Sequence, residues 1–339
     1  MSTTMRRARG GVAIIAAALA LTLALAAASA GAAEVLVDRS FHRLAEGLVH
    51  LRSVAGSGAA GEPPVLLLHP SPSSSRTLEP LLRELAARRP GVQLLAPDTL
   101  GNGDSAPPAP ETPDAAYFAD ALVRLLDTLK IERIDLYGAH TGARIAAEFA
   151  VAYPQRVRRL VLDGIADYPA EIKQQILANY APAVQPDEYG RQFIWAFNFI
   201  RDQQLHFPYF LRRPEYRLAT TMPAPEDLHL RTLDVLKALQ TYHKPYLAAF
   251  RYPARERLPR VAAPTLFTIT ASEPPALKTM SRELAALVPA ARVEEVDATP
   301  GGQGGGDGCL LRRALSGGAP GPTARSPCPA PHAGPLKLP

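Results

Sequence analysis

A histidine within a short glycine motif is the strongest candidate for chemistry in this sequence. His140 is the central residue of Gly138–Gly142 (GAHTG), directly after the apolar run Ile134–Tyr137 and before a helical pattern. A sharp strand-to-helix turn needs a residue at positive φ between small neighbours, and histidine is among the side chains enriched in that conformation. An imidazole at such a turn can act as a general acid or base, or as a nucleophile, near neutral pH.

Short apolar runs alternate with helical patterns on both sides of this motif. The predicted strands are residues 64–68, 92–96, 134–137, 159–162, 264–269 and 293–296, and the predicted helices are residues 78–87, 117–129, 144–153 and 277–287. Continuous apolar runs separated by helices are typical of a mostly parallel sheet that helices cover on both faces. We therefore expect an α/β fold.

Residues 166–260 interrupt this alternation. They are rich in aromatic residues and helical patterns and contain no strand-like run. This composition predicts an inserted helical lid. Its aromatic side chains either line an apolar substrate pocket or pack the lid onto the core, and the sequence leaves both readings open.

Two further motifs accompany the glycine turn, each after a predicted strand. One is the His69-Pro70 loop, and the other is Pro97–Ser105 (PDTLGNGDS). With these three motifs in this order, residues 35–296 resemble the α/β-hydrolase superfamily, in particular lidded members similar to haloalkane dehalogenases, epoxide hydrolases and iminopeptidases. The resemblance implies a hydrolase core in two parts, residues 34–165 and 261–298, separated by the lid at 166–260.

The sequence departs from the superfamily at two catalytic positions. Members with a nucleophile carry Ser, Asp or Cys at the seat that His140 occupies here, and an imidazole has no hydroxyl to offer for acyl transfer. Members also place a histidine base after the last strand, where this chain reads Asp297–Gly302 (DATPGG). The next histidine is His332, in the Gly/Pro-rich tail.

The resemblance implies further site residues. It puts the orienting carboxylate at Glu273, after the strand at 264–269, or at Asp163, after the strand at 159–162. If either carboxylate reaches His140, it would orient the imidazole and raise its pKa. The oxyanion hole would be formed by the backbone N–H of Thr141 and, because the preceding proline has no N–H, by that of Ser71.

The other polar residues of these loops are expected to be structural. We expect His69 to be a hydrogen-bonding residue, Ser71 and Ser73–Ser75 a solvated turn or helix cap, and Asp98 and Asp104 turn formers. The histidines of the body show no metal-ligand spacing such as HExxH, so neither a metal nor another cofactor is expected.

Three functions fit these observations. The first is a hydrolase, or a related acid–base enzyme, in which His140 acts on a small, largely apolar substrate beneath the lid. The alternative is a catalytically inactive binding protein that keeps the hydrolase fold and has lost its triad. The third is a hydrolase with a displaced nucleophile such as Ser71.

The two ends of the chain differ from the body. Residues 1–33 have a basic start, an apolar run and small residues typical of a secretory signal, which predicts a periplasmic or secreted protein without stable membrane insertion after cleavage. The alternative interpretation of this segment is an uncleaved membrane anchor. Residues 299–339 are rich in Gly and Pro and are expected to be disordered, and a reading-frame change near Gly304 is one hypothesis for their composition. The net charge of +5 comes partly from arginines at both ends, so nucleic acid is not an expected partner.

Overall fold

The computed structural model describes residues 35–56, 62–218, 220–270, 273–289 and 291–296. The chain divides into two units, Met1–Leu36 and Val37–Pro339, and the fold below is that of the second unit. The predicted signal at 1–33 and the predicted tail at 299–339 lie outside the described residues. Among the helices in the described ranges, none combines the length and the apolar character needed to cross a membrane.

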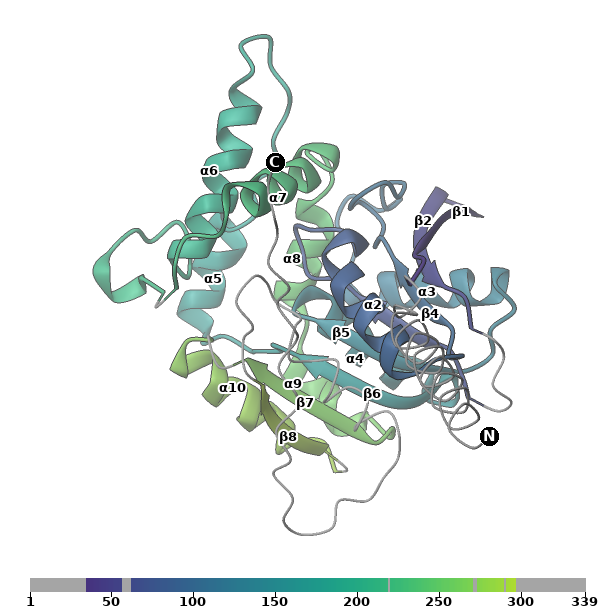
Figure 1. Ribbon diagram of the computed structural model, residues 1–339. Helices are drawn as coiled ribbons and strands as arrows, with labels where there is room; N and C mark the ends of the chain where they lie inside the picture. The colour runs from purple at the N-terminus through teal and green to yellow at the C-terminus, as the bar shows by residue number, and fades with distance from the viewer. Residues whose placement is uncertain (1–34, 57–61, 219, 271–272, 290, 297–339) are drawn as a thin grey trace, which may run out of the picture. The chain divides into compact units, whose positions relative to one another are not determined.

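An eight-stranded sheet forms the centre of the second unit (Figure 1), with the strand order β1-β2-β4-β3-β5-β6-β7-β8. The strands are β1 (Asp38–Leu44), β2 (Gly47–Val54), β3 (Val65–Leu68), β4 (Leu94–Pro97), β5 (Ile134–Ala139), β6 (Val157–Asp163), β7 (Thr265–Thr270) and β8 (Ala291–Val296). The pairs from β4 to β8 are parallel, and β1 and β2 join as an antiparallel hairpin. The predicted, mostly parallel sheet is confirmed.

Helices cover both faces of this sheet. Those that follow core strands are α2 (Glu79–Arg88), α3 (Ala115–Thr128), α4 (Thr141–Ala152) and α10 (Pro275–Ala285). The connection β3-α2-β4 runs along the sheet in the opposite direction to β5-α4-β6, so right-handed crossovers place α2 and α4 on opposite faces. All residues of β3 and β5 are buried, as expected of strands covered on both sides.

A helical insertion lies between β6 and β7. Its helices are α5 (Ala170–Asn179), α6 (Arg191–Leu205), α7 (Pro225–Lys237), α8 (His243–Arg251) and α9 (Ala254–Arg257). Short 3-10 helices lie in the insertion at Pro214–Tyr216 and Leu258–Arg260, and in the core at Ser75–Leu78 and Pro154–Arg156. Many aromatic side chains of the insertion pack on one another around buried Tyr180, whose ring centroid is 5.0 Å from that of Phe250 and 5.4 Å from that of Tyr246. These rings form a hydrophobic core of the insertion itself.

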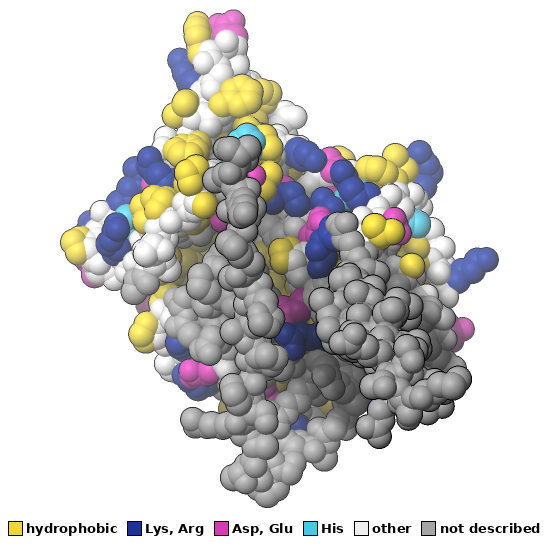
Figure 2. Space-filling view, in the orientation of Figure 1, with side chains coloured by type: hydrophobic (Ala, Val, Ile, Leu, Met, Phe, Trp, Pro, Cys, Tyr) yellow, Lys and Arg dark blue, Asp and Glu magenta, His cyan; other side chains and the backbone are white. Residues whose placement is uncertain are grey.

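One face of α6 remains apolar and exposed. Phe193, Ile194 and Phe197 are 57%, 67% and 41% exposed, and hydrophobic side chains gather over α6 in the space-filling view (Figure 2). The remaining aromatic residues of α6, Trp195 and Phe199, stack on each other with centroids 4.8 Å apart. The helix therefore contributes one face to the core of the insertion and presents another to solvent.

Candidate functional site

The turn between β5 and α4 places His140 at the carboxyl edge of the sheet. His140 has φ 47° and ψ −98° and directly precedes Thr141, the first residue of α4. The helix thus begins three residues before the predicted helix at 144–153. The two flanking glycines are required by space. A Cβ at Gly138 would lie 2.3 Å from the carbonyl oxygen of Gly142, and a Cβ at Gly142 would lie 2.3 Å from that of Leu68. The motif thus allows strand, turn and helix to approach closely while His140 holds a strained backbone conformation.

The side chains of His140 and Glu273 meet at Gly164, the residue after β6. A Cβ built on Gly164 would lie 2.5 Å from Cε1 and 2.7 Å from Nδ1 of His140, and 2.8 Å from Oε1 of Glu273. The imidazole and the carboxyl group therefore lie next to each other, over a backbone position that has room because it carries no side chain. Gly164 has φ 62°, a conformation that favours glycine.

The pKa of the His140 imidazole is lowered from its ordinary value, mainly because the partly buried ring loses contact with solvent. The charge of Asp163 and a hydrogen bond with the backbone of Gly164 act in the opposite direction, and the charge of Arg144 lowers the pKa further. The sequence-based expectation of a raised pKa therefore holds for the contribution of Asp163, but the effect of burial is larger. The lowered pKa favours the unprotonated ring at neutral pH.

Burial has the opposite effect on Glu273. It raises the pKa of this carboxyl group to about 8, and the negative charge of Asp163 adds to the shift, while Lys278 and Arg144 oppose it. Within the described ranges, Oε2 of Glu273 is buried and has no hydrogen-bond partner. At neutral pH the site therefore holds a mostly protonated carboxylic acid beside a neutral imidazole.

Asp163, the other predicted carboxylate, ends β6 and is buried. Its carboxylate accepts hydrogen bonds from the hydroxyl groups of Tyr137 (2.8 Å) and Thr268 (2.9 Å), which lie on the two neighbouring strands. Its backbone carbonyl accepts from the N–H of His140 at 2.8 Å. Asp163 thus fixes the backbone of the turn and acts on the imidazole through its charge.

Arg144 is a site residue that sequence reasoning missed. It lies one helical turn after His140 and is buried. Its guanidinium donates to the carbonyl oxygen of His140 at 3.0 Å and to that of Ala166 at 2.5 Å, which joins the start of α4 to the loop after β6. The i+4 spacing from His140 was the available signal, since residues with that spacing share a helix face.

The loop after β3 carries the predicted oxyanion donor. Ser71 is buried, and its hydroxyl has no hydrogen-bond partner among the described residues. Thr141 begins α4, so its N–H has no carbonyl acceptor one helical turn earlier. Both imidazole nitrogens of His69 are engaged, one with the carbonyl oxygen of Pro70 (2.9 Å) and one with the N–H of Thr99 (2.9 Å). This arrangement fits the structural role expected of His69 and leaves it unable to act as a base for Ser71.

The serines of this loop are buried and not solvated, contrary to expectation. Ser74 caps the short helix Ser75–Leu78 by accepting from the N–H of Arg76 at 3.4 Å. The cap was one of the two predicted roles. Burial arises because residues of α7 also contact this loop, which the sequence alone does not indicate.

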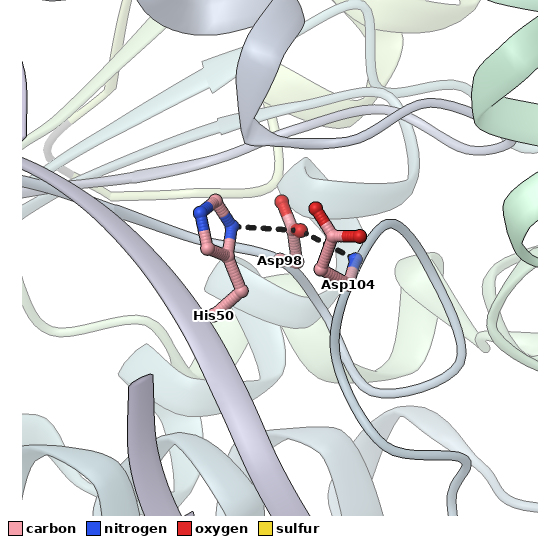
Figure 3. Close-up of side chains that lie close together, drawn as sticks. All are labelled: His50, Asp98 and Asp104. Carbon is pink, nitrogen blue, oxygen red and sulfur yellow. Dashed lines mark hydrogen bonds and ion pairs between the residues drawn. The ribbon is translucent and has the colours of Figure 1, made fainter. Parts of the chain in front are cut away.

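A second cluster of ionisable side chains supports the loop after β4 (Figure 3). Oδ2 of Asp98 accepts from Nδ1 of His50 at 2.9 Å and from the backbone N–H of Asp104 at 2.9 Å. The second nitrogen of His50 accepts from Nε of Arg39 at 3.0 Å, and the carboxylate of Asp104 pairs with Arg39 and Lys237. Because protein donors already occupy these ligand atoms and two cations lie beside them, the cluster fits a structural role and does not suit a metal ion. It extends the turn-forming roles predicted for Asp98 and Asp104.

Comparison with known proteins agrees with this architecture. The chain is 33% identical over 173 residues to 2-hydroxymuconate semialdehyde hydrolase of Pseudomonas sp. strain CF600, which covers 48% of this chain and 60% of that protein. It is 38% identical over 114 residues to epoxide hydrolase 2 of Siraitia grosvenorii, covering 33% of this chain and 34% of that protein. The chain therefore spans less than two thirds of the length of these relatives.

Solved structures and a family model cover more of the chain. The crystal structure of epoxide hydrolase A from Mycobacterium thermoresistibile superposes with a TM-score of 0.62 at 20% identity and covers 83% of this chain and 99% of that one. The family model for the alpha/beta hydrolase fold matches residues 63–301, which include every element from β3 to β8. The protein is a member of the α/β-hydrolase fold family.

Proposed function

We propose that this protein is a hydrolase in which His140 is the general base and Glu273 the general acid. The observation that carries the proposal is the contact of both side chains with one backbone position, Gly164. The opposite shifts of their pKa values support it, since a neutral imidazole is a proton acceptor and a protonated carboxyl group is a proton donor at the same pH.

The reaction is the addition of water to an electrophilic carbon that carries an oxygen leaving group. The unprotonated nitrogen of His140 accepts a proton from water while the water oxygen forms its bond to carbon. Glu273 gives its proton to the leaving oxygen as the carbon–oxygen bond breaks, and transfer of the proton from His140 to Glu273 restores both groups. The negative charge of Asp163 stabilises the imidazolium in between.

The oxyanion formed on an acyl substrate would lie at the N-terminus of α4. The N–H of Thr141 points out of the first helical turn, where the helix dipole favours negative charge. The N–H of Ser71 is the second proposed donor. The unpartnered hydroxyl of Ser71 supports placing a polar substrate atom near this loop.

We further propose that the helical insertion, residues 166–260, is a lid over this site and that its aromatic composition favours a small, largely apolar substrate. Many of these rings pack in the insertion's own core. Only the remaining aromatic side chains can therefore contact a substrate. The predicted signal at 1–33 supports export to the periplasm or the medium.

A panel of nitrophenyl esters, epoxides and haloalkanes tests the proposal. We expect the wild type to turn over esters or epoxides, whose leaving atom is oxygen, a loss of at least about a hundredfold in His140→Ala and in Glu273→Gln, and no change in His229→Ala, which removes an exposed histidine of α7. Haloalkanes lack an oxygen leaving group, and turnover of haloalkanes alone would contradict the role of Glu273. Turnover that survives in His140→Ala and disappears in Ser71→Ala would establish the displaced nucleophile instead.

The inactive binding protein remains the alternative function, and the absence of a serine, aspartate or cysteine at the turn position of His140 supports it. Thermal unfolding of the wild type with the same compounds distinguishes the two functions. Ligand-induced stabilisation without turnover of any compound would contradict the catalytic proposal and support binding.

A further inference from the structure

One face of α7 contacts two loops of the core: the loop after β3, which carries the proposed oxyanion donor Ser71, and the loop after β4. Asp234, Lys237 and Thr241 follow each other at the spacing of a single helix face that continues into the turn after α7. Asp234 contacts the loop after β3, whereas Lys237 and Thr241 contact the loop after β4. The hydroxyl of Thr241 donates to the carbonyl oxygen of Gly101 at 2.9 Å.

Asp234 makes the strongest of these contacts. Its side chain is only 5% exposed and accepts from Arg76 Nη2 at 2.7 Å, from Arg76 Nε at 3.4 Å and from the hydroxyl of Ser74 at 3.0 Å. A two-pronged contact between a guanidinium and a buried carboxylate fixes direction as well as distance. The negative charge of Asp234 also acts on Arg231, which lies on the same helix.

Lys237 provides a second, more exposed ion pair. Its amine lies 2.8 Å from Oδ1 and 2.9 Å from Oδ2 of Asp104, whose backbone N–H is held by Asp98. Asp98 also accepts from the N–H of Ser75 at 2.7 Å. The two loops are thus hydrogen-bonded to each other as well as to α7. Polar contacts therefore connect the loop after β3, the loop after β4 and α7 in a closed circuit.

We propose that Asp234 is a positioning residue, which holds the loop that carries Ser71. The oxyanion site is therefore assembled only when α7 packs on the core. The reasoning is geometric: Ser74 and Arg76 are three and five residues from Ser71, and both are fixed by a carboxylate that belongs to the insertion. This inference rests on the proposed function for the role of Ser71, but the coupling of α7 to the loop is measurable without turnover.

Hydrogen–deuterium exchange of residues 69–78 in the full chain measures the coupling directly. We expect Asp234→Asn to raise amide exchange in this segment by about tenfold, whereas Glu226→Gln, which removes an exposed acid from the same helix, leaves it unchanged. Trp195 is the only tryptophan of the chain and packs in the core of the insertion, so unchanged emission shows that the insertion itself stays folded. Equal exchange in Asp234→Asn and Glu226→Gln would overturn the proposal.

A double-variant comparison supplies a second test in case Asp234→Asn proves too unstable. Arg76→Met leaves the Asp234 carboxylate buried without its main partner, so exchange in 69–78 should rise more in Arg76→Met than in Arg76→Met/Asp234→Asn, where no anion remains. Exchange in Arg76→Met that is equal to or lower than that in the double variant would show that Arg76 and Asp234 act independently, contrary to the proposal.

Kinetics separate positioning from simple substrate binding. Loss of an aligned oxyanion donor lowers kcat, and we expect about a tenfold fall in kcat with little change in KM for Asp234→Asn. A rise in KM at unchanged kcat would contradict a positioning role. If the wild type shows no turnover, the proposed function fails, and the exchange experiment still decides whether Asp234 couples α7 to the loop.

Discussion

Replacing Gly164 by alanine is the most direct test of the placement of His140 and Glu273 beside the same backbone position. The new Cβ would lie 2.5 Å from Cε1 of His140 and 2.8 Å from Oε1 of Glu273, whereas ordinary van der Waals contact begins at 3.4 Å. The imidazole and the carboxyl group must therefore each move away from the new Cβ by up to about 1 Å, a displacement that costs about a hundredfold in rate when it affects catalytic groups.

The same substitution also affects the free energy of unfolding. Alanine at the φ of 62° costs about 1–2 kcal/mol, and the crowding adds about 1–3 kcal/mol. Gly190→Ala is the matched control, because Gly190 has φ 69° and its nearest neighbour would be a Phe193 ring atom at 3.4 Å. The control carries the backbone cost alone.

Denaturant unfolding and turnover of an ester substrate measure the two effects side by side. We expect Gly164→Ala to lose both stability and about a hundredfold in kcat/KM, and Gly190→Ala to lose stability alone. Turnover of Gly164→Ala equal to that of Gly190→Ala would refute the view that His140 and Glu273 act together over this position.

Four further predictions concern the pH dependence of activity, the pH dependence of stability, a buried ion pair and the turn. Activity should follow a bell-shaped pH profile, which rises through the lowered pKa of His140, below its ordinary 6.5, and falls near pH 8 as Glu273 loses its proton. Because folding raises the pKa of Glu273, the wild type should lose stability relative to Glu273→Gln as pH rises from about 4.5 to 8. A difference in unfolding free energy between the two proteins that is the same at pH 5 and at pH 9 would contradict this. Arg158→Met should cost about 3–5 kcal/mol in urea unfolding, since it strips the partner from Asp135, which is fully buried and 2.8 Å from Arg158 Nε; a loss below 1 kcal/mol would show that water reaches the carboxylate. Gly142→Ala should prevent folding or lower Tm more than any of these changes, because its Cβ would lie 2.3 Å from a backbone carbonyl of β3, and a wild-type Tm would disprove the close approach.

Strand positions were predictable wherever burial is complete. The apolar runs at 64–68 and 134–137 correspond to β3 and β5, which have no exposed residue. The hairpin of β1 and β2 was not predicted from the sequence. β1 (DRSFHRL) lies at the edge of the sheet and contains no buried residue, so its sequence has no continuous apolar run to reveal it.

The sequence by itself determined that a histidine stands at the turn between a central strand and its helix, because glycine spacing and strand-helix alternation are local properties. It also indicated Glu273 and Asp163 through family resemblance. Only the tertiary structure decided that Glu273 and His140 meet at Gly164 and that Arg144 lies beside them. Protonation states were equally a tertiary outcome: the pKa shifts of His140 and Glu273 arise mainly from burial, and burial depends on how distant segments pack, which no local pattern specifies.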